Sequence, residues 1–328
     1  MSNELLVVVI VAALVFDFTN GFHDTATAIA TSVSTRALSP RSAVTLAAIG
    51  NLFGALLSTA VATTIATSLL VVDQVAGDAL LAGLLAAIAW NIATWYLGLP
   101  TSSSHALIGG LIGAALAAGG TDAVQWGELG GRVVVPALVA PPIGFAVAYL
   151  LMRSLIRVSG GRSRPGGARP MRRAQVASAA FVAVAHGAND AQKTMGVIAL
   201  ALVASGTQDE LSIPRWTVFA AAGALAFGTS FGGWRIVRTL GQRIARLEPA
   251  HGFVAETSAA CVLYGTAALG VPVSTTHVIG GSIAGVGATR RMSAVRWRVA
   301  ADIVVAWALT VPVTATVAAA GVALASLL

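Results

Sequence analysis

Charged residues are scarce in this chain of 328 residues: Asp, Glu, Lys and Arg make up 10% of it, against about 25% in a soluble domain. Long segments hold no charge at all, and each could fill a bilayer core, which needs about 20 apolar residues. We therefore predict an integral membrane protein with several spans. We exclude a soluble enzyme and, despite a net charge of +7, a nucleic-acid binder. The charge-free segments are 42–72, 79–121, 133–152, 216–234, 257–289 and 303–328.

Cysteine is nearly absent as well. Cys261 is the only one, so no intrachain disulfide can form, which excludes a disulfide-stabilised secreted scaffold. The N-terminal segment carries an acidic Glu4 and no basic residue ahead of its apolar run, unlike a signal peptide. We interpret this segment as the first membrane span.

The hydropathy pattern predicts ten membrane segments, which must be helices because lipid cannot satisfy free backbone groups. If every segment crosses, seventeen of the twenty basic residues fall on one side, which the positive-inside rule makes cytoplasmic. Both termini then face outward. The Arg-, Gly- and Pro-rich linker 157–173 becomes a cytoplasmic loop, either solvated or in contact with lipid headgroups. The segments are 4–34, 43–70, 79–98, 100–118, 133–152, 174–205, 216–234, 251–270, 272–288 and 300–327.

The two halves of the chain carry the same motifs in the same order. With five segments in each half, the second copy starts from the opposite face, so the repeats are inverted, as in many secondary transporters. We predict a first repeat over 1–156, a linker over 157–173 and a second repeat over 174–328, with broken or re-entrant helices at the membrane midplane. The matched motifs are NGFHDTAT at 20–27 with HGANDAQK at 186–193, and GLPTSSSHALIGGLIG at 98–113 with GVPVSTTHVIGGSIAG at 270–285.

An aspartate occupies the same place inside a membrane segment of each repeat. A carboxylate in lipid is costly, so Asp24 and Asp190 are predicted to bind a coupling ion or a proton. A glycine three residues before each, and a polar residue directly before it, favour a helix break that exposes main-chain atoms to the ion. A carboxylate satisfied at a helix end is the alternative. The accompanying motif residues are Gly21, His23, Thr25, Gly187, Asn189 and Gln192.

Three consecutive hydroxyl residues follow a proline in each repeat. A helix that begins there has free main-chain N–H groups, and the hydroxyls add donors, so each helix end suits an anion. Two such ends, facing each other across the pseudo-two-fold axis, would cradle a tetrahedral oxyanion. Ordinary N-capping is the alternative, although a cap needs only one hydroxyl. The residues are Ser102, Ser103, Ser104, Ser274, Thr275 and Thr276.

Other titratable residues accompany these motifs. Lys193, the only lysine, follows Asp190 by three residues and is predicted to pair with it, because a buried ammonium needs a partner. His105 and His277 are predicted to fix their loops by hydrogen bonds, with a ligand or proton-relay role as the alternative. Too few ligands surround these two histidines for a metal site.

Three titratable residues lie outside the motifs. Glu256 is either a coupling-site residue or an edge residue, His251 is interpreted as a surface residue, and Asp17 as an interfacial or packing feature. Two GxxxG pairs are predicted to pack helices closely. These glycines are Gly109, Gly113, Gly281 and Gly285.

Three segments resemble signatures of the inorganic phosphate transporter (PiT) family, and the resemblance covers essentially the whole chain. It implies phosphate uptake driven by a cation gradient, sodium in some members and protons in others, while some relatives carry metal–phosphate complexes or sulfate. It also implies ion-site roles for Asp24 and Asp190, phosphate contacts from both hydroxyl clusters, and homodimerisation. The segments are DFTNGFHDTATAIATSVSTRALSP, AHGANDAQKTMG and PVSTTHVIGGSIAGVG.

The chain departs from the family pattern at three positions. Members often have Asn three residues after each motif aspartate, where this chain has Thr27 and Lys193, and His23 replaces an Asn. We expect the Lys193 ammonium to take the place of one coupling cation. That favours proton coupling, with sodium coupling as the alternative.

The combined prediction is a multi-pass protein of the cell membrane that imports inorganic phosphate by alternating access, without a cofactor. Sulfate or metal–phosphate symport is the alternative within the same class. A membrane phosphatase or phosphotransferase is the alternative from another class, and it would need a nucleophile and a general base near the interface. The only hint of these is His105 and His277 beside the hydroxyls.

Overall fold

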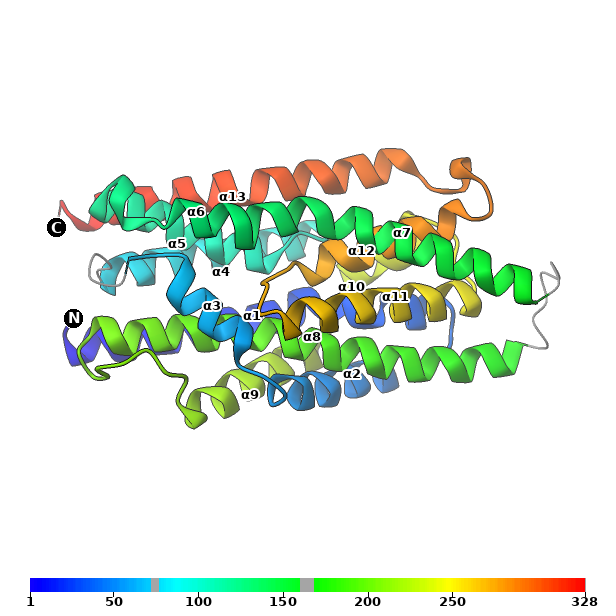
Figure 1. Cartoon of the computed structure of the whole chain (residues 1–328), viewed down its shortest axis with the longest axis horizontal. Helices are drawn as coiled ribbons and strands as arrows, with labels where there is room; N and C mark the ends of the chain where they lie inside the picture. The colour runs from blue at the N-terminus through cyan, green and yellow to red at the C-terminus, as the bar shows by residue number, and fades with distance from the viewer. Residues whose placement is uncertain (72–76, 160–167, 328) are drawn as a thin grey trace.

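The structure is a computed structural model that describes residues 1–71, 77–159 and 168–327. The regular secondary structure of these residues is helical, apart from one isolated bridge between Leu70 and Val124. Figure 1 shows an elongated bundle whose helices run along one axis. The elements are α1 (Asn3–Ser34), α2 (Pro40–Ala55), α3 (Ala60–Ser68), α4 (Gly77–Leu97), α5 (Ser103–Gly119), η2 (Thr121–Ala123), α6 (Trp126–Leu129), η3 (Gly130–Val134), α7 (Val135–Val158), α8 (Ala168–Ala204), α9 (Arg215–Phe231), α10 (Trp234–Arg238), η4 (Thr239–Arg243), α11 (Pro249–Ala268), α12 (Thr275–Ala288), η5 (Met292–Ala294) and α13 (Trp297–Ala325).

Several helices are long and apolar enough to cross a membrane. In the described part of the chain, four helices qualify by length and composition: Asn3–Ser34, Gly77–Leu97, Trp126–Val158 and Trp297–Ala325. The pair α2 and α3 passes the same test when taken together, with a bend of 68° between the two helices. Helix α8 is longer still, with 37 residues, and its central turns carry buried polar side chains.

Not all ten predicted membrane segments cross the bundle, because two pairs of them form hairpins, in line with the re-entrant helices expected at the midplane. Helix α5 folds back along α4: the main chains approach at Gly83 and Gly110, and Thr101 donates to Thr94 over 3.0 Å at the tip. Helices α11 and α12 form the equivalent hairpin from the opposite end of the bundle (Figure 1). Each hairpin returns to the end from which it started. The chain termini therefore still lie at the same end, as predicted.

The predicted helix breaks beside Asp24 and Asp190 are also wrong, since α1 and α8 run through them without interruption. The motif glycines have another function. A Cβ at Gly21 would collide with the main chain of α9, and one at Gly187 with the main-chain oxygen of Asn51 in α2. The absence of a side chain lets α9 approach α1 closely at Gly21, and lets α2 approach α8 closely at Gly187. The chain breaks instead between α2 and α3, between α9 and α10, and at the two hairpin tips.

The GxxxG pairs pack helices closely, as predicted, and they do so across the two halves of the chain. Gly109 and Gly113 of α5 lie against α13, whereas Gly281 and Gly285 of α12 lie against α7. Each short helix of one half is therefore held by the last long helix of the other half. This exchange fixes both short helices, and the polar residues at their N-terminal ends, in the middle of the bundle (Figure 1).

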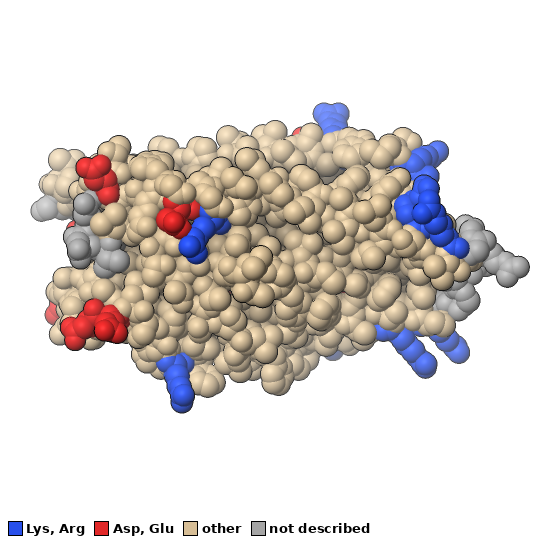
Figure 2. All heavy atoms as spheres, viewed as in Figure 1, with Lys and Arg blue, Asp and Glu red and all other residues tan. Residues whose placement is uncertain are grey.

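Charge is separated along the bundle. Figure 2 shows Lys and Arg gathered at one end of the visible face and Asp and Glu mainly at the other. This separation agrees with the predicted division of basic and acidic connections. Residues 160–167 of the predicted linker 157–173 lie outside the described residues, whereas α7 ends at Val158 and α8 begins at Ala168.

Candidate functional site

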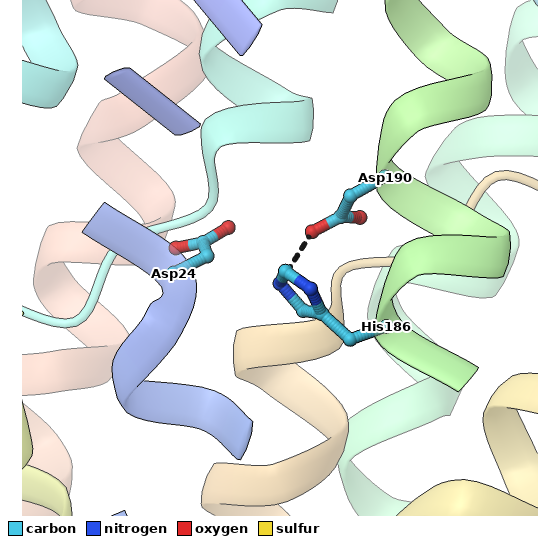
Figure 3. Close-up of side chains that lie close together, drawn as sticks. All are labelled: Asp24, His186 and Asp190. Atoms are coloured by element: carbon cyan, nitrogen blue, oxygen red, sulfur yellow. Dashed lines mark ion pairs between the residues drawn. The ribbon is translucent and has the colours of Figure 1, made fainter. Parts of the chain in front are cut away.

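The candidate site lies where the N-terminal ends of α5 and α12 meet the middle of α1 and α8. Asp24 comes from α1, and His186 and Asp190 come from α8; Figure 3 shows the three side chains directed toward one another. One ligand atom from each lies within 4.8 Å of the others, and all three residues are buried. The matched aspartates of the two repeats, Asp24 and Asp190, therefore lie close together.

The first two hydroxyls of each triplet act within their own half of the chain. Ser102 and Ser274 cap α5 and α12 by accepting from the amides of His105 and His277 over 3.2 Å, so N-capping accounts for one hydroxyl in each triplet. The second hydroxyls bind the aspartates. Ser103 donates to Asp24 over 2.6 Å and Thr275 to Asp190 over 3.2 Å.

The third hydroxyl of each triplet reaches across to the other half. Thr276 donates to Asp24 Oδ1 over 3.3 Å, and Ser104 accepts from the Lys193 ammonium over 2.5 Å. All six hydroxyl residues are buried. The repeat thus gives each position in the triplet a separate contact, and the third position joins the two halves at the site.

Lys193 pairs with Asp190, as predicted. Its ammonium also contacts Ser104 Oγ and, at 3.4 Å, the main-chain oxygen of Val273. A carboxylate, a hydroxyl and a carbonyl oxygen are the ligand types that a hard cation takes in proteins. With 1% of its surface exposed, Lys193 supplies one buried positive charge between the two halves.

His23 is the neighbour of Asp24 in space as well as in sequence. Its Nδ1 lies 2.6 Å from Asp24 Oδ1, and its Nε2 lies 3.0 Å from Thr94 Oγ1 and 3.3 Å from Thr101 Oγ1. The ring therefore connects the carboxylate to the tip of the α4–α5 hairpin. Sequence reasoning singled out neither Thr94, which lies outside the repeated motifs, nor Thr101, which lies inside the motif at 98–113.

His186 is the member of this cluster that sequence reasoning did not single out. Its signal was present, because it precedes Asp190 by four residues and so shares its helix face. The Thr229 hydroxyl donates to Leu225 O, so it accepts from the Asn51 side chain, whose Nδ2 is the donor. The Asn51 side-chain oxygen is then left to face His186 Nδ1 at 2.9 Å, and it accepts the proton on that nitrogen. His186 Nε2 lies 2.9 Å from Asp190 Oδ2. Among the described residues this nitrogen has no hydrogen-bond partner, and a proton between the two atoms would make the close approach favourable.

Four predicted site residues do not contact the carboxylate cluster by hydrogen bonds. Thr25 donates to Gly21 O and Thr229 O. Asn189 donates to Leu263 O and Ala185 O, and Gln192 accepts from the first amides of α3. Their contacts position helices around the site. The fourth residue, Glu256, belongs to a separate network.

Glu256 lies buried in α11, where it accepts from three neutral donors. Thr31 and Gln175 donate to Oε1 and Ser178 donates to Oε2. Gln175 also accepts from Thr35 over 2.7 Å. The edge position considered from the sequence is wrong, since Glu256 has no exposed surface.

His105 and His277 lie behind the site and against each other, with ring centroids 4.7 Å apart. His277 also stacks on Trp307 of α13 at 3.9 Å. In the described residues, neither nitrogen of the His277 ring has a hydrogen-bond partner, nor does Nε2 of His105. The rings line an apolar cavity of about 920 Å³ beside α7 and α13. Packing, rather than the predicted hydrogen bonding, holds these two rings.

Two further histidine and aspartate predictions are corrected or refined. His251 is buried, with 4% of its surface exposed, and is not a surface residue, because it lies in the first turn of α11 inside the bundle. Asp17 is a buried residue of α1 whose carboxylate has no hydrogen-bond partner among the described residues. It therefore belongs to the interior rather than the interface.

The site holds charges of both signs close together. Asp24 and Asp190 supply two carboxylates, and Lys193 supplies one ammonium, so the cluster carries one net negative charge when the imidazoles are neutral. The hydroxyls of both triplets and the first amides of α5 and α12 supply donors for an anion. A proton added at His186 and Asp190 brings the cluster to neutrality. The arrangement can therefore bind a proton and an anion together.

A membrane bundle with paired half-helices that end on a buried polar cluster is typical of transport proteins. The sequence model of the phosphate transporter family matches residues 20–166 and again 159–318. The chain belongs to this family, the phosphate transporter or PiT family, as the sequence motifs indicated. Membership of a transporter family also agrees with the prediction that the chain is not an enzyme.

Close relatives share the whole length of the chain. A Rhizobium meliloti protein is 46% identical over 324 residues, covering 97% of this chain and 96% of the relative. A Bacillus subtilis protein is 42% identical over 321 residues, covering 96% and 95%. A Mycobacterium tuberculosis protein is 47% identical over 317 residues, covering 96% and 76%. Each of the three is described as a probable low-affinity inorganic phosphate transporter.

A solved structure shares the fold. The sodium-dependent phosphate transporter superposes with a TM-score of 0.90, covering 99% of this chain and 100% of that structure, at 23% sequence identity. The likeness supports the arrangement of helices described above.

Proposed function

We propose that this chain imports inorganic phosphate across the cell membrane by symport with a proton. The single observation that carries the proposal is the charge arrangement at the site: the Lys193 ammonium already pairs with Asp190, and the unpartnered Nε2 of His186 lies 2.9 Å from the same carboxylate, where one more proton would join them. The descriptions of the relatives as inorganic phosphate transporters support the substrate.

Phosphate fits the donors and acceptors of the site. Hydroxyls and helix N-terminal amides donate to the oxygens of any tetrahedral oxyanion. Phosphate near neutral pH also carries a proton, because phosphate groups titrate near pH 6, and this proton can be donated to Asp24 or Asp190. Sulfate has no such proton, so the carboxylates favour phosphate over sulfate.

Protonation and anion binding support each other in this arrangement. Without the added proton the cluster is negative and repels phosphate; with it the cluster is neutral. Carrying a bare anion inward against the membrane potential costs about 2.3 kcal/mol per charge per 100 mV. A co-transported proton cancels one charge and supplies the driving force. The two halves then rock about the site, exchanging the contacts that Thr276 and Ser104 make between them.

Sodium coupling is the alternative, and Lys193 argues against it. The ammonium is bound by Asp190, Ser104 and the carbonyl of Val273, an oxygen ligand set that would suit a metal cation. While Lys193 occupies this position, no cation can bind there.

The orientation that we propose puts both termini outside and the arginine-rich end in the cytoplasm.

A specific observation favours one other cargo, a metal–phosphate complex. The ligand atoms of Asp24, His186 and Asp190 lie within 4.8 Å of one another, and two carboxylates with an imidazole suit a divalent metal ion. Uptake that requires added divalent metal, in step with metal accumulation, would favour this cargo over phosphate alone.

The proposal is tested by uptake of labelled phosphate into proteoliposomes that contain the purified protein. A proton gradient and a sodium gradient are imposed separately, with sulfate as a competitor. We expect accumulation with the proton gradient alone, little competition by sulfate, and no accumulation by Asp190→Asn. Accumulation that needs sodium would refute proton coupling while leaving phosphate as the substrate.

A further inference from the structure

A second polar pocket lies away from the site, between the end of α4 and the segment formed by α10 and η4. Its volume is about 450 Å³, and Arg235, Arg238 and Arg243 line it together with Tyr96 and Trp234. We propose that this pocket binds a phosphate group, carried by an anionic membrane lipid or by free inorganic phosphate. This binding site is separate from the transport site and does not depend on the proposed function.

Among the described residues, the three arginines have no acidic partner. Within residues 1–71, 77–159 and 168–327, none of their guanidinium groups forms an ion pair, and residues 160–167 contain no Asp or Glu. Guanidinium groups stay charged at all physiological pH values, so they repel one another across the pocket. A phosphate group relieves this repulsion, because its oxygens match the guanidinium fork in bidentate pairs.

Part of the pocket wall is already fixed in place. Arg235 donates to the main-chain oxygen of Tyr96, and its guanidinium carbon lies 4.5 Å from the centre of the Tyr96 ring. Thr239 donates to Gly98 O over 2.8 Å. The wall thus joins η4 to the tip of the α4–α5 hairpin, four residues before Ser102. A phosphate group bound here would brace the hairpin that carries the first hydroxyl triplet.

The repeat provides an internal comparison. At the other hairpin tip, Gly270 lies against α3 in the same way as Gly98 lies against α10. A Cβ at Gly270 would meet Ala60 O and Thr64 Oγ1 at 3.2 Å, and a Cβ at Gly98 would meet Arg235 O at 3.4 Å. Thr64 therefore corresponds to Thr239. At the positions of the three arginines, the first half has Ala60, Thr63 and Ser68. The fold evidently does not need charge at these positions.

Membrane orientation alone does not explain the cluster. The positive-inside rule asks for basic residues at one end of the bundle, and Arg246, Arg290 and Arg291 already supply them. It does not ask for three guanidinium groups to line one cavity against an aromatic ring. Gly241, near the third arginine, packs on Ala30 and Ser34 at the last turns of α1, so the cavity lies in the arginine-rich half of the bundle.

The surroundings of the pocket favour a lipid headgroup as the source of the phosphate. Tyr96 and Trp234 are 61% and 43% exposed on the outside of the bundle. Arg243 follows Gly241, which packs on the last turns of α1, so this side of the pocket lies toward the arginine-rich end of the bundle, where basic side chains meet headgroup phosphates. A free phosphate ion would meet the same guanidinium groups, so the experiment must separate the two sources.

The test uses the full chain purified in detergent and two probes, dioctanoyl phosphatidylglycerol and potassium phosphate. Thermal unfolding is followed against lipid concentration, and the number of phosphate ions bound is measured with labelled phosphate. The test variant is Arg238→Ala with Arg243→Ala. The matched control is Arg246→Ala with Arg291→Ala, which removes the same charge outside the pocket. If the test variant does not fold, Arg238→Lys with Arg243→Lys keeps the charge and loses the bidentate fork.

We expect the lipid to raise the unfolding temperature of the wild type and of the control. The test variant should need about 25-fold more lipid for the same effect, since each arginine near a membrane surface contributes about fivefold. Unchanged phosphate binding in the test variant would identify the lipid as the source. Loss of one bound phosphate ion, with no change in the lipid response, would identify free phosphate. If the test variant matches the control with both probes, the proposal is wrong.

Discussion

Replacing Lys193 by Gln should expose the role of its charge. Lys193 and Asp190 are 1% and 0% exposed, so the substitution leaves a buried carboxylate without its ammonium. Breaking a buried ion pair in this way costs about 3–5 kcal/mol. Removing both charges, in Asp190→Asn with Lys193→Gln, should cost less than Lys193→Gln alone, because no unpaired charge remains.

The same substitution should create a cation site. The oxygens of Asp190, Ser104 and Val273 that surround the ammonium would become free to bind sodium. We therefore expect sodium, but not choline, to raise the unfolding temperature of Lys193→Gln and to have no effect on the wild type. Phosphate uptake by the variant, assayed in proteoliposomes, should become dependent on sodium.

Two results would refute this reasoning about Lys193. One is a variant as stable as the wild type in choline, which would mean that the ammonium does not compensate the Asp190 carboxylate. The other is uptake by Lys193→Gln that keeps the proton dependence of the wild type and ignores sodium. Asp190→Asn with Lys193→Gln serves as the control, since it lacks the carboxylate and should not respond to sodium.

Three further predictions concern single residues. His186→Gln should lower uptake driven by a pH gradient at least tenfold, with little change in unfolding temperature; equal uptake would refute a proton site there. Ser103→Ala removes a hydrogen bond to a carboxylate, worth about 1.5–3 kcal/mol, and should raise the KM for phosphate about tenfold or more, whereas exposed Ser230→Ala should leave it unchanged. Gly187→Ala should prevent the normal packing of α8 on α2. Gly223 has open space around it, so Gly223→Ala should stabilise its helix by about 0.5–1 kcal/mol. The yields and unfolding temperatures of both variants check this.

The repeated motifs allowed most of the site to be predicted. Duplication by itself places Asp24 beside Asp190, because matched positions meet at a pseudo-two-fold axis. Spacing along a helix predicted the pair of Lys193 and Asp190, since residues three apart share a face. The same rule applied to His186 would have found it four residues before Asp190. The duplication did not mark it, because the matched motif has Asn20 at the position of His186.

Hairpins and continuous helices could not be distinguished by composition. An apolar segment such as 79–98 has the length and hydropathy of a span, yet α4 turns back at Gly98 because its partner α5 holds it. The breaks expected at Gly21 and Gly187 did not occur, because these glycines make room for neighbouring helices. Burial of Glu256 and His251 likewise depends on which helices surround α11, and this is a property of the tertiary structure.

The central claim is that a proton moves inward with each phosphate ion. The most direct measurement is the pH outside proteoliposomes, in sodium-free buffer, when phosphate is added to the wild type and to His186→Gln. We predict that the medium becomes alkaline as labelled phosphate enters the wild-type vesicles, and that both signals fall together in the variant. Phosphate entry without proton movement, or entry only after sodium is added, would contradict the claim.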